Sequence, residues 1–235
     1  MSNYDRNAAG ALADRTVAID AGLRAYMLRV YNYMAMGVGL TGLVAMLTYQ
    51  FTGPALLESP LMWVFMLAPV GLVFFISSRI NTLSAETARL LFFVYAALVG
   101  VSLSTIFHVY TGASITRVFF ISAATFGSLS LWGYTTRRDL SGFGTFLIMG
   151  VIGIVIASLV NLFLRSSGLD WVISIIGVGV FAGLTAYDTQ RIKGMYDSND
   201  DTTSAGRKAV MGALSLYLDF INLFMMLLRL AGNRR

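Results

Sequence analysis

The chain has 235 residues, of which 57% are hydrophobic and only 12% are charged. A soluble domain carries about 25% charged residues, so half that density indicates a protein whose main solvent is lipid. The absence of cysteine excludes disulfides, thiolate metal sites and cysteine nucleophiles. The formal net charge of +5 comes without a basic patch interleaved with aromatic residues, and we therefore expect no binding to nucleic acid.

The N-terminal segment, residues 1–20, is polar and lacks the apolar core and cleavage signal of a secretory peptide. We expect it to stay on the mature protein as a cytoplasmic tail, followed by a single seven-span membrane domain over residues 21–235. Seven runs are apolar and long enough to cross a bilayer as helices: Val30–Thr48, Leu61–Ser78, Leu90–Val109, Val118–Tyr134, Phe143–Leu164, Trp171–Tyr187 and Val210–Leu230. The sequence therefore predicts an all-α integral membrane protein with seven transmembrane helices.

The distribution of basic residues predicts the orientation in the membrane. Cytoplasmic loops carry an excess of lysine and arginine. With a cytoplasmic N-terminus, the opposite side holds only five of the 17 basic residues, namely Arg117, Arg165, Arg229, Arg234 and Arg235. An odd number of spans places the basic C-terminal tail outside, unless the last segment returns as a re-entrant hairpin. No proline or glycine interrupts residues 213–230, so we expect a full crossing.

One acid stands inside the last apolar run. Asp219 lies within Ala213–Leu228, which is otherwise long and oily enough to span a bilayer. A carboxylate at mid-bilayer depth costs roughly 2.5–3.5 kcal/mol on insertion scales, so such a group usually has a partner, a water-filled cavity or a proton. We therefore interpret Asp219 as part of a functional site.

A second acid, Asp188, closes the sixth span. Taken alone, it is explained as a helix-end carboxylate that pairs with Arg191 or Lys193. Asp219 lies about two to three turns into the seventh helix, so it comes within reach of Asp188 if the two helices pack together. Two carboxylates in a poorly hydrated site cannot both ionise at low cost, and they titrate as a unit. We expect the pair to act as a pH sensor, because losing a shared proton adds a repulsive charge that separates the helices.

The polar segment 197–206, between the last two runs, is expected to be a flexible connector. Asp197, Asn199 and Asp201 occupy the first three ligand positions of an EF-hand, but the loop lacks the sharp-turn glycine and the bidentate glutamate. A solvated acidic loop is the better interpretation.

Enzyme activity is not expected. His108 and Ser114 flank one short loop, and nucleophilic catalysis would need a base in hydrogen-bond reach of an activated serine together with an oxyanion hole. Ser114 stands in no Gly-x-Ser-x-Gly or similar setting, and His108 is the only histidine.

Two segments carry a resemblance to a known family. Ala186-Tyr-Asp188-Thr-Gln-Arg-Ile-Lys193 and Ser215-Leu-Tyr-Leu-Asp219-Phe-Ile-Asn-Leu-Phe224 closely resemble the transmembrane Bax inhibitor motif family, including bacterial homologues, and the similarity covers residues 20–232. The resemblance implies a helical bundle with the last helix central and surrounded by the other six. It also implies a pH-sensitive calcium leak in which Asp188 and Asp219 form a di-aspartyl sensor. Bacterial relatives have an arginine latch at the end of the second span, for which Arg79 is the candidate here.

An ion path needs oxygen ligands and water, and Asn222 can add its side-chain oxygen to those of Asp188 and Asp219. Asn222 lies at i+3 from Asp219 and faces the same side of the helix, although an interhelical hydrogen bond explains it equally well. The acid pair is also the candidate for a weak calcium site. No cofactor is expected, and calcium would be the transported ion.

The function predicted from the sequence is a pH-sensitive cation leak, with calcium as the ion, in the bacterial inner (plasma) membrane. The first alternative is a non-conducting interaction protein that regulates a membrane protease or a stress-response partner. The second is a small-solute or proton-coupled transporter. The expected partners are the lipid bilayer, calcium or other cations, and a membrane protein.

Overall fold

Helices make up nearly all of the structure. The computed structural model describes residues 3–53 and 59–235, with residues 3–20 as backbone only. The helices are α1 (Asn3–Thr52), α3 (Leu61–Arg79), α4 (Ala85–Leu103), α5 (Ile106–Val109), α6 (Gly112–Thr135), α7 (Ser141–Leu164), α8 (Ser167–Gly194) and α9 (Thr202–Ala231). Within the described residues, β-structure is limited to one isolated bridge between Tyr110 and Arg234. The predicted all-α fold is confirmed.

Seven helical segments of the described chain are long and apolar enough to cross a membrane. Each contains one of the predicted runs, and α4 and α5 together form the third, over residues 85–109. The helices extend beyond the runs, and α9 begins at Thr202 instead of Val210. The reason is a cap, since the Asp201 carboxylate accepts a hydrogen bond of 2.8 Å from the Ser204 backbone N–H. The connector expected over residues 197–206 is therefore shorter, because its second half is the first turn of α9.

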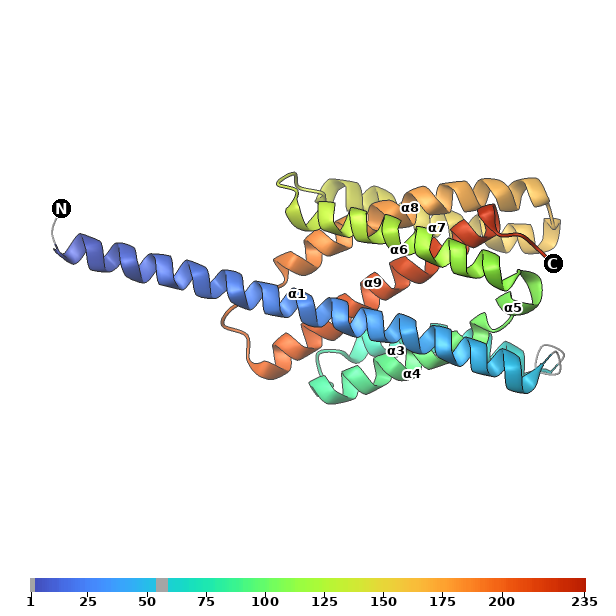
Figure 1. Cartoon of the computed structure of the whole chain (residues 1–235), viewed down its shortest axis with the longest axis horizontal. Coiled ribbons are helices and arrows are strands. Elements are labelled where there is room, and N and C mark those ends of the chain that lie inside the picture. The colour runs from blue at the N-terminus through green and yellow to red at the C-terminus, as the bar shows by residue number, and fades with distance from the viewer. Residues whose placement is uncertain (1–2, 54–58) are drawn as a thin grey trace.

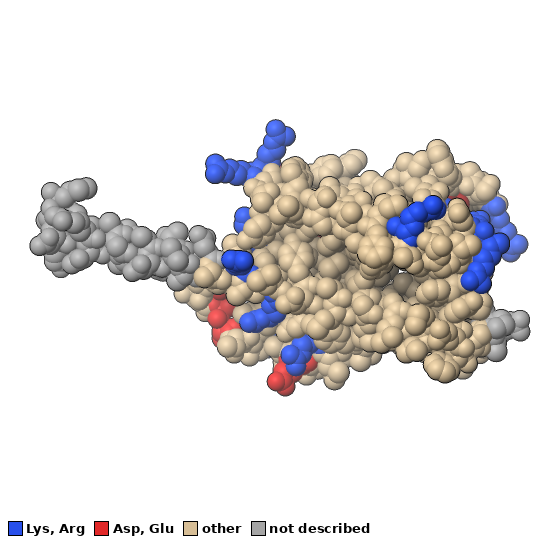
Figure 2. Space-filling view, viewed as in Figure 1, with Lys and Arg blue, Asp and Glu red and all other residues tan. Residues whose placement is uncertain are grey.

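The helices run along the long axis of the molecule and alternate in direction (Figure 1). One end, here named the α8–α9 end, holds the connections α3–α4, α6–α7 and α8–α9. The other, the C-terminal end, holds the C-terminus, α5 and the α7–α8 turn. In Figure 2, lysine and arginine gather toward these two ends and leave a largely uncharged band between them. Such a band is what a membrane-spanning bundle presents to the hydrocarbon core.

The last helix is central, as predicted. In α9, 61% of the residues in the apolar window are buried, against 11% in α7. α9 packs against α1, α4, α6 and α8, whereas α3 packs mainly on α4, and α7 mainly on α8. Four helices thus surround α9 closely, and α3 and α7 form an outer layer instead of completing a ring of six.

α9 crosses the whole bundle without a break. The chain after it is fixed at the C-terminal end, where the Thr111 N–H donates to the Asn233 carbonyl over 3.1 Å and the Arg235 N–H donates to the Val109 carbonyl over 2.9 Å. The last segment is therefore a full crossing, and the re-entrant hairpin is excluded.

Candidate functional site

Two acids that are far apart in sequence lie on neighbouring helices. Asp188 of α8 and Asp219 of α9 are buried, with exposed fractions of 8% and 5%. α8 and α9 share the most extensive helix–helix contact in the described structure. The two acids therefore lie on the two helices of this contact, although no hydrogen bond between the described side chains joins their carboxyl groups.

Asp219 has an unsatisfied oxygen. Its Oδ2 is buried, and no group among the described residues forms a hydrogen bond with it. An ionised carboxylate in such surroundings is costly to bury, whereas a protonated one, or one with a bound cation, is not. A purely structural acid would have its hydrogen bonds completed by the fold. Asp219 is therefore a candidate for a group that exchanges a proton or a cation.

Arg191 is the cation that the fold brings to this pair. Its Nη2 lies 3.4 Å from Asp188 Oδ1, and the same nitrogen donates a hydrogen bond of 3.2 Å to Ser215 Oγ. Ser215 precedes Asp219 by four residues, so Arg191 ties the end of α8 to α9 one turn away from the buried acid. The sequence predicted Arg191 only as a helix-end partner of Asp188. Ser215 was missed, although its spacing of four residues from Asp219 places both side chains on the same face of α9.

The other two predicted residues have different surroundings. Arg79, at the end of α3, is exposed, and within the described part of the chain it has no ion pair with either acid. Its role as a latch stays a prediction, while the position beside Asp188 is occupied by Arg191. The Asn222 amide donates 2.8 Å to the Leu218 carbonyl of its own helix. This bond differs from the interhelical bond that was considered.

A cavity of about 520 Å³ opens at the α8–α9 end, between the ends of α3 and α8 and the first turns of α9. Four of the α9 residues that line it recur at helical spacing on one face, namely Ser204, Lys208, Met211 and Ser215. Asp219 occupies the next position on the same face, four residues after Ser215. The cavity therefore leads along α9 from the end of the bundle to within one turn of the buried acid. Sequence reasoning missed it, because its other walls come from α3 and α8.

The two carboxyl groups do not make a complete metal site by themselves. Among the described residues there is no cluster of three or more His, Cys, Asp or Glu side chains. Calcium takes six to eight oxygen ligands, so two carboxyl groups would leave most of its shell to water or to carbonyl groups. This suits a transient site better than a permanent one.

The comparisons with known proteins agree with this architecture. The sequence model of the family described as "Inhibitor of apoptosis-promoting Bax1" matches residues 23–235. The inner membrane protein YbhL of Escherichia coli is 49% identical over 230 residues, which are 95% of this chain and 97% of the relative. The protein RP147 of Rickettsia prowazekii is 45% identical over 237 residues that cover 100% of both chains. The membrane protein SpyM3_0260 of Streptococcus pyogenes is 37% identical over 218 residues, 91% of this chain and 95% of the relative.

The match extends over the whole seven-helix bundle and includes both acidic segments, so the resemblance seen in those segments is confirmed for the chain as a whole. With relatives that share its length and a bundle built to cross a membrane, the chain is an integral membrane protein that belongs to the Bax inhibitor family.

Proposed function

We propose that the protein is a pH-sensitive cation leak, with calcium as the transported ion, and that Asp188 and Asp219 control it. The observation that carries the proposal is the buried oxygen of Asp219, which has no hydrogen-bond partner among the described residues. A group of this kind inside a membrane protein typically marks an ion or proton path. The cavity that ends one turn away supplies an approach from the α8–α9 end.

The mechanism follows from the charge balance of the site. A proton on either acid leaves one negative charge beside the positive charge of Arg191, and the α8–α9 contact is then balanced. Loss of that proton leaves two negative charges and one positive charge between two packed helices. The excess negative charge pushes α8 from α9 and attracts a cation into the same space. Proton loss thereby couples pH to both helix separation and ion affinity.

We further propose that the α8–α9 end faces the cytoplasm of the cell, in the inner (plasma) membrane. This end carries 12 of the 17 basic residues, as the positive-inside rule requires of a cytoplasmic side. The Escherichia coli relative is an inner membrane protein. The cavity and the acid pair would then respond to cytoplasmic pH.

A flux measurement tests the proposal. Purified protein is reconstituted into liposomes that contain a calcium-sensitive dye, and influx is recorded across a range of pH. We expect pH-dependent flux in the wild type and a large loss of that dependence in Asp219→Asn. The matched control is Asp139→Asn, which changes an exposed acid on the α6–α7 connection at the same end and should leave the flux unchanged. Folded wild-type protein without flux at any pH would instead support the non-conducting regulatory role.

A further inference from the structure

The cavity at the α8–α9 end has an unexpected charge for the mouth of a cation path. Its walls contain three cationic side chains, Arg191, Arg207 and Lys208, and one acid, Asp200. Lys208 is already neutralised, because its Nζ lies 2.6 Å from Asp200 Oδ2. The remaining positive charge repels cations and attracts anions. The cavity is thus suited to an anionic ligand.

Arg207 has donors left over. It is half-buried, and its Nη1 donates 2.8 Å to the Asn81 carbonyl at the end of α3. Its Nε is buried and has no hydrogen-bond partner within the described structure. The contact with Asn81 holds the guanidinium through Nη1 and leaves the Nε donor without a partner among the described residues. Arginine binds phosphate oxygens by paired donors of this kind.

One further acid acts on Arg207. Asp201 interacts with its charge, but the Asp201 carboxylate already caps α9 through Ser204. Arg191 also lines the cavity, where its Nη2 contacts Asp188 and Ser215 and 46% of its side chain is exposed. Arg207 is therefore the more buried of the two arginines in the cavity and Arg191 the more exposed one.

The rest of the cavity indicates which anion fits. Four of its residues are apolar, namely Ile80, Ile192, Met195 and Met211, and serine hydroxyl groups lie beside the basic groups. Its position at the ends of α3 and α8 is the depth at which lipid headgroups meet the hydrocarbon core. A phosphate group attached to an apolar body matches both kinds of wall.

We propose that this cavity binds a phosphate group through Arg207 and Arg191, carried by the headgroup of an anionic lipid or by a free phosphate ion. Binding neutralises the mouth of the cavity and draws Arg191 away from Asp188. The acid pair then loses its cation, so the ligand changes the pH response of the site. This last consequence rests on the proposed leak, whereas the binding itself does not.

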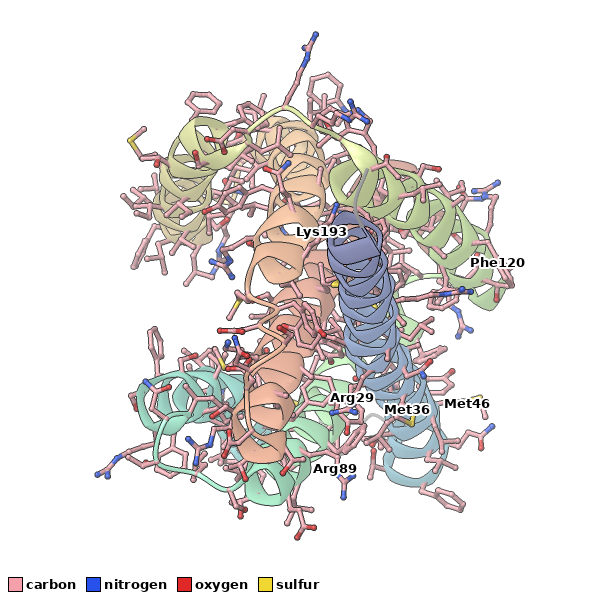
Figure 3. The ribbon with its side chains drawn as sticks, turned by 90° about the vertical axis from the view of Figure 1, so that its left-hand side faces the viewer. Arg29, Met36, Met46, Arg89, Phe120 and Lys193 are labelled. Carbon is pink, nitrogen blue, oxygen red and sulfur yellow. The ribbon has the colours of Figure 1, made fainter. Side chains whose placement is uncertain are left out.

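A binding experiment without any flux readout tests the site. The melting temperature of the purified protein in a neutral detergent is measured with short-chain phosphatidylglycerol, with inorganic phosphate, and with short-chain phosphatidylcholine as the control lipid. A ligand that binds only the folded state raises this temperature as its concentration rises. The variants are Arg207→Gln, Arg207→Lys and Arg89→Gln, the last being an exposed arginine on α4 at the same end but outside the cavity (Figure 3).

We expect phosphatidylglycerol to raise the melting temperature of the wild type and of Arg89→Gln. Arg207→Gln should bind about tenfold more weakly or worse, which is the loss of a charge-assisted hydrogen bond. Arg207→Lys keeps the charge without the paired donors, so its affinity should lie between those of the wild type and Arg207→Gln. This intermediate affinity also separates lost binding from lost folding. A shift with inorganic phosphate that also depends on Arg207 identifies the phosphate group alone as the ligand, and a shift with phosphatidylglycerol alone identifies the lipid.

Absence of any shift with both phosphate compounds overturns the proposal, and so does a shift that is the same in the wild type and Arg207→Gln. Failure of the leak leaves this result untouched, because no ion flux enters the measurement. If binding is shown and the leak is also present, phosphatidylglycerol in the liposomes should change the pH dependence of calcium flux in the wild type but not in Arg207→Gln.

Discussion

The two ends of α8 and α9 carry acid–arginine groups of opposite balance. At the C-terminal end, Asp170 lies 3.7 Å from Arg229 and 3.9 Å from Arg234, so one acid has two cations. At the α8–α9 end, Asp188 pairs with Arg191 over 3.4 Å, and Asp219 is a second buried acid without an ion pair among the described residues, so two acids stand beside one arginine. Arginines thus outnumber acids in the group at the C-terminal end, and acids outnumber arginines in the group of Asp188, Asp219 and Arg191.

The two groups differ in burial and in the number of their partners. The Asp170 carboxyl group has two arginine partners within 4 Å, and its side chain is 35% exposed to solvent. Asp219 is buried, and its Oδ2 has no hydrogen-bond partner among the described residues. The C-terminal end therefore joins the helices through partly exposed ion pairs, and under the proposed mechanism the α8–α9 end is the part that responds to pH.

Removing one acid should have the largest effect. Asp188→Asn leaves one acid and one arginine at the α8–α9 end, which is a balanced pair like an ordinary salt bridge. We expect the pH dependence of calcium flux in liposomes to be lost over the range in which the wild type responds. If Asp188→Asn kept the wild-type pH profile, the two acids would not act as a unit, and the comparison between the two ends would fail.

Removing Arg191 should shift the pH dependence of calcium flux instead of abolishing it. Arg191→Gln leaves two acids without a cation, and a nearby positive charge favours the ionised form of a carboxyl group. Without it the pair holds its proton to higher pH, so the midpoint of the flux profile should move upward by roughly one pH unit or more. The control is Arg138→Gln, an exposed arginine of the α6–α7 connection at the same end, which should not move the midpoint.

Removing the Asp170 ion pairs should lower the stability of the fold and leave the pH dependence of calcium flux unchanged. Asp170→Asn breaks two long, partly exposed ion pairs, and such pairs contribute about 0–1 kcal/mol each. We expect a small fall in the melting temperature of the detergent-solubilised protein and an unchanged midpoint of calcium flux. A shifted midpoint in Asp170→Asn would mean that both ends of α8 and α9 contribute to the response.

The sequence predicts the parts of this comparison that depend on hydrophobicity and spacing. Each predicted span lies inside a helical segment, with α4 and α5 together forming the third, because about 20 apolar residues suffice to mark a crossing. Asp219 is conspicuous for the same reason, as a charge within such a run. The helix ends are less predictable, because capping by Asp201 carries α9 across polar residues that hydropathy assigns to a loop.

The tertiary partners were beyond the reach of the sequence. Arg191 could be matched to Asp188 from its i+3 spacing, but its second bond, to Ser215, depends on how α8 packs against α9. The cavity beside them also needs the end of α3, which is more than 100 residues away from α9. Nothing in the local pattern of Arg207 distinguishes it from the other basic residues of the same end.

The smallest expected effect concerns the cap of α9 by Asp201 at the α8–α9 end. Hydrogen bonds from the Ser204 side chain and its backbone N–H hold the pKa of the Asp201 carboxyl below its ordinary value. A depressed pKa stabilises the folded state above the ordinary pKa, near 3.9, and this contribution is lost as pH falls through the lower folded value.

Asp201→Ala should therefore lower the melting temperature slightly at neutral pH, and the difference from the wild type should vanish in strong acid. Asp201→Asn retains the cap, because asparagine caps helices as well as aspartate does, and should melt near the wild type without this dependence. Because Asp201 titrates only in acid, neither variant should alter the pH response near neutrality. An altered pH dependence of calcium flux would indicate that the sensor lies at the start of α9 and not at the buried acid pair.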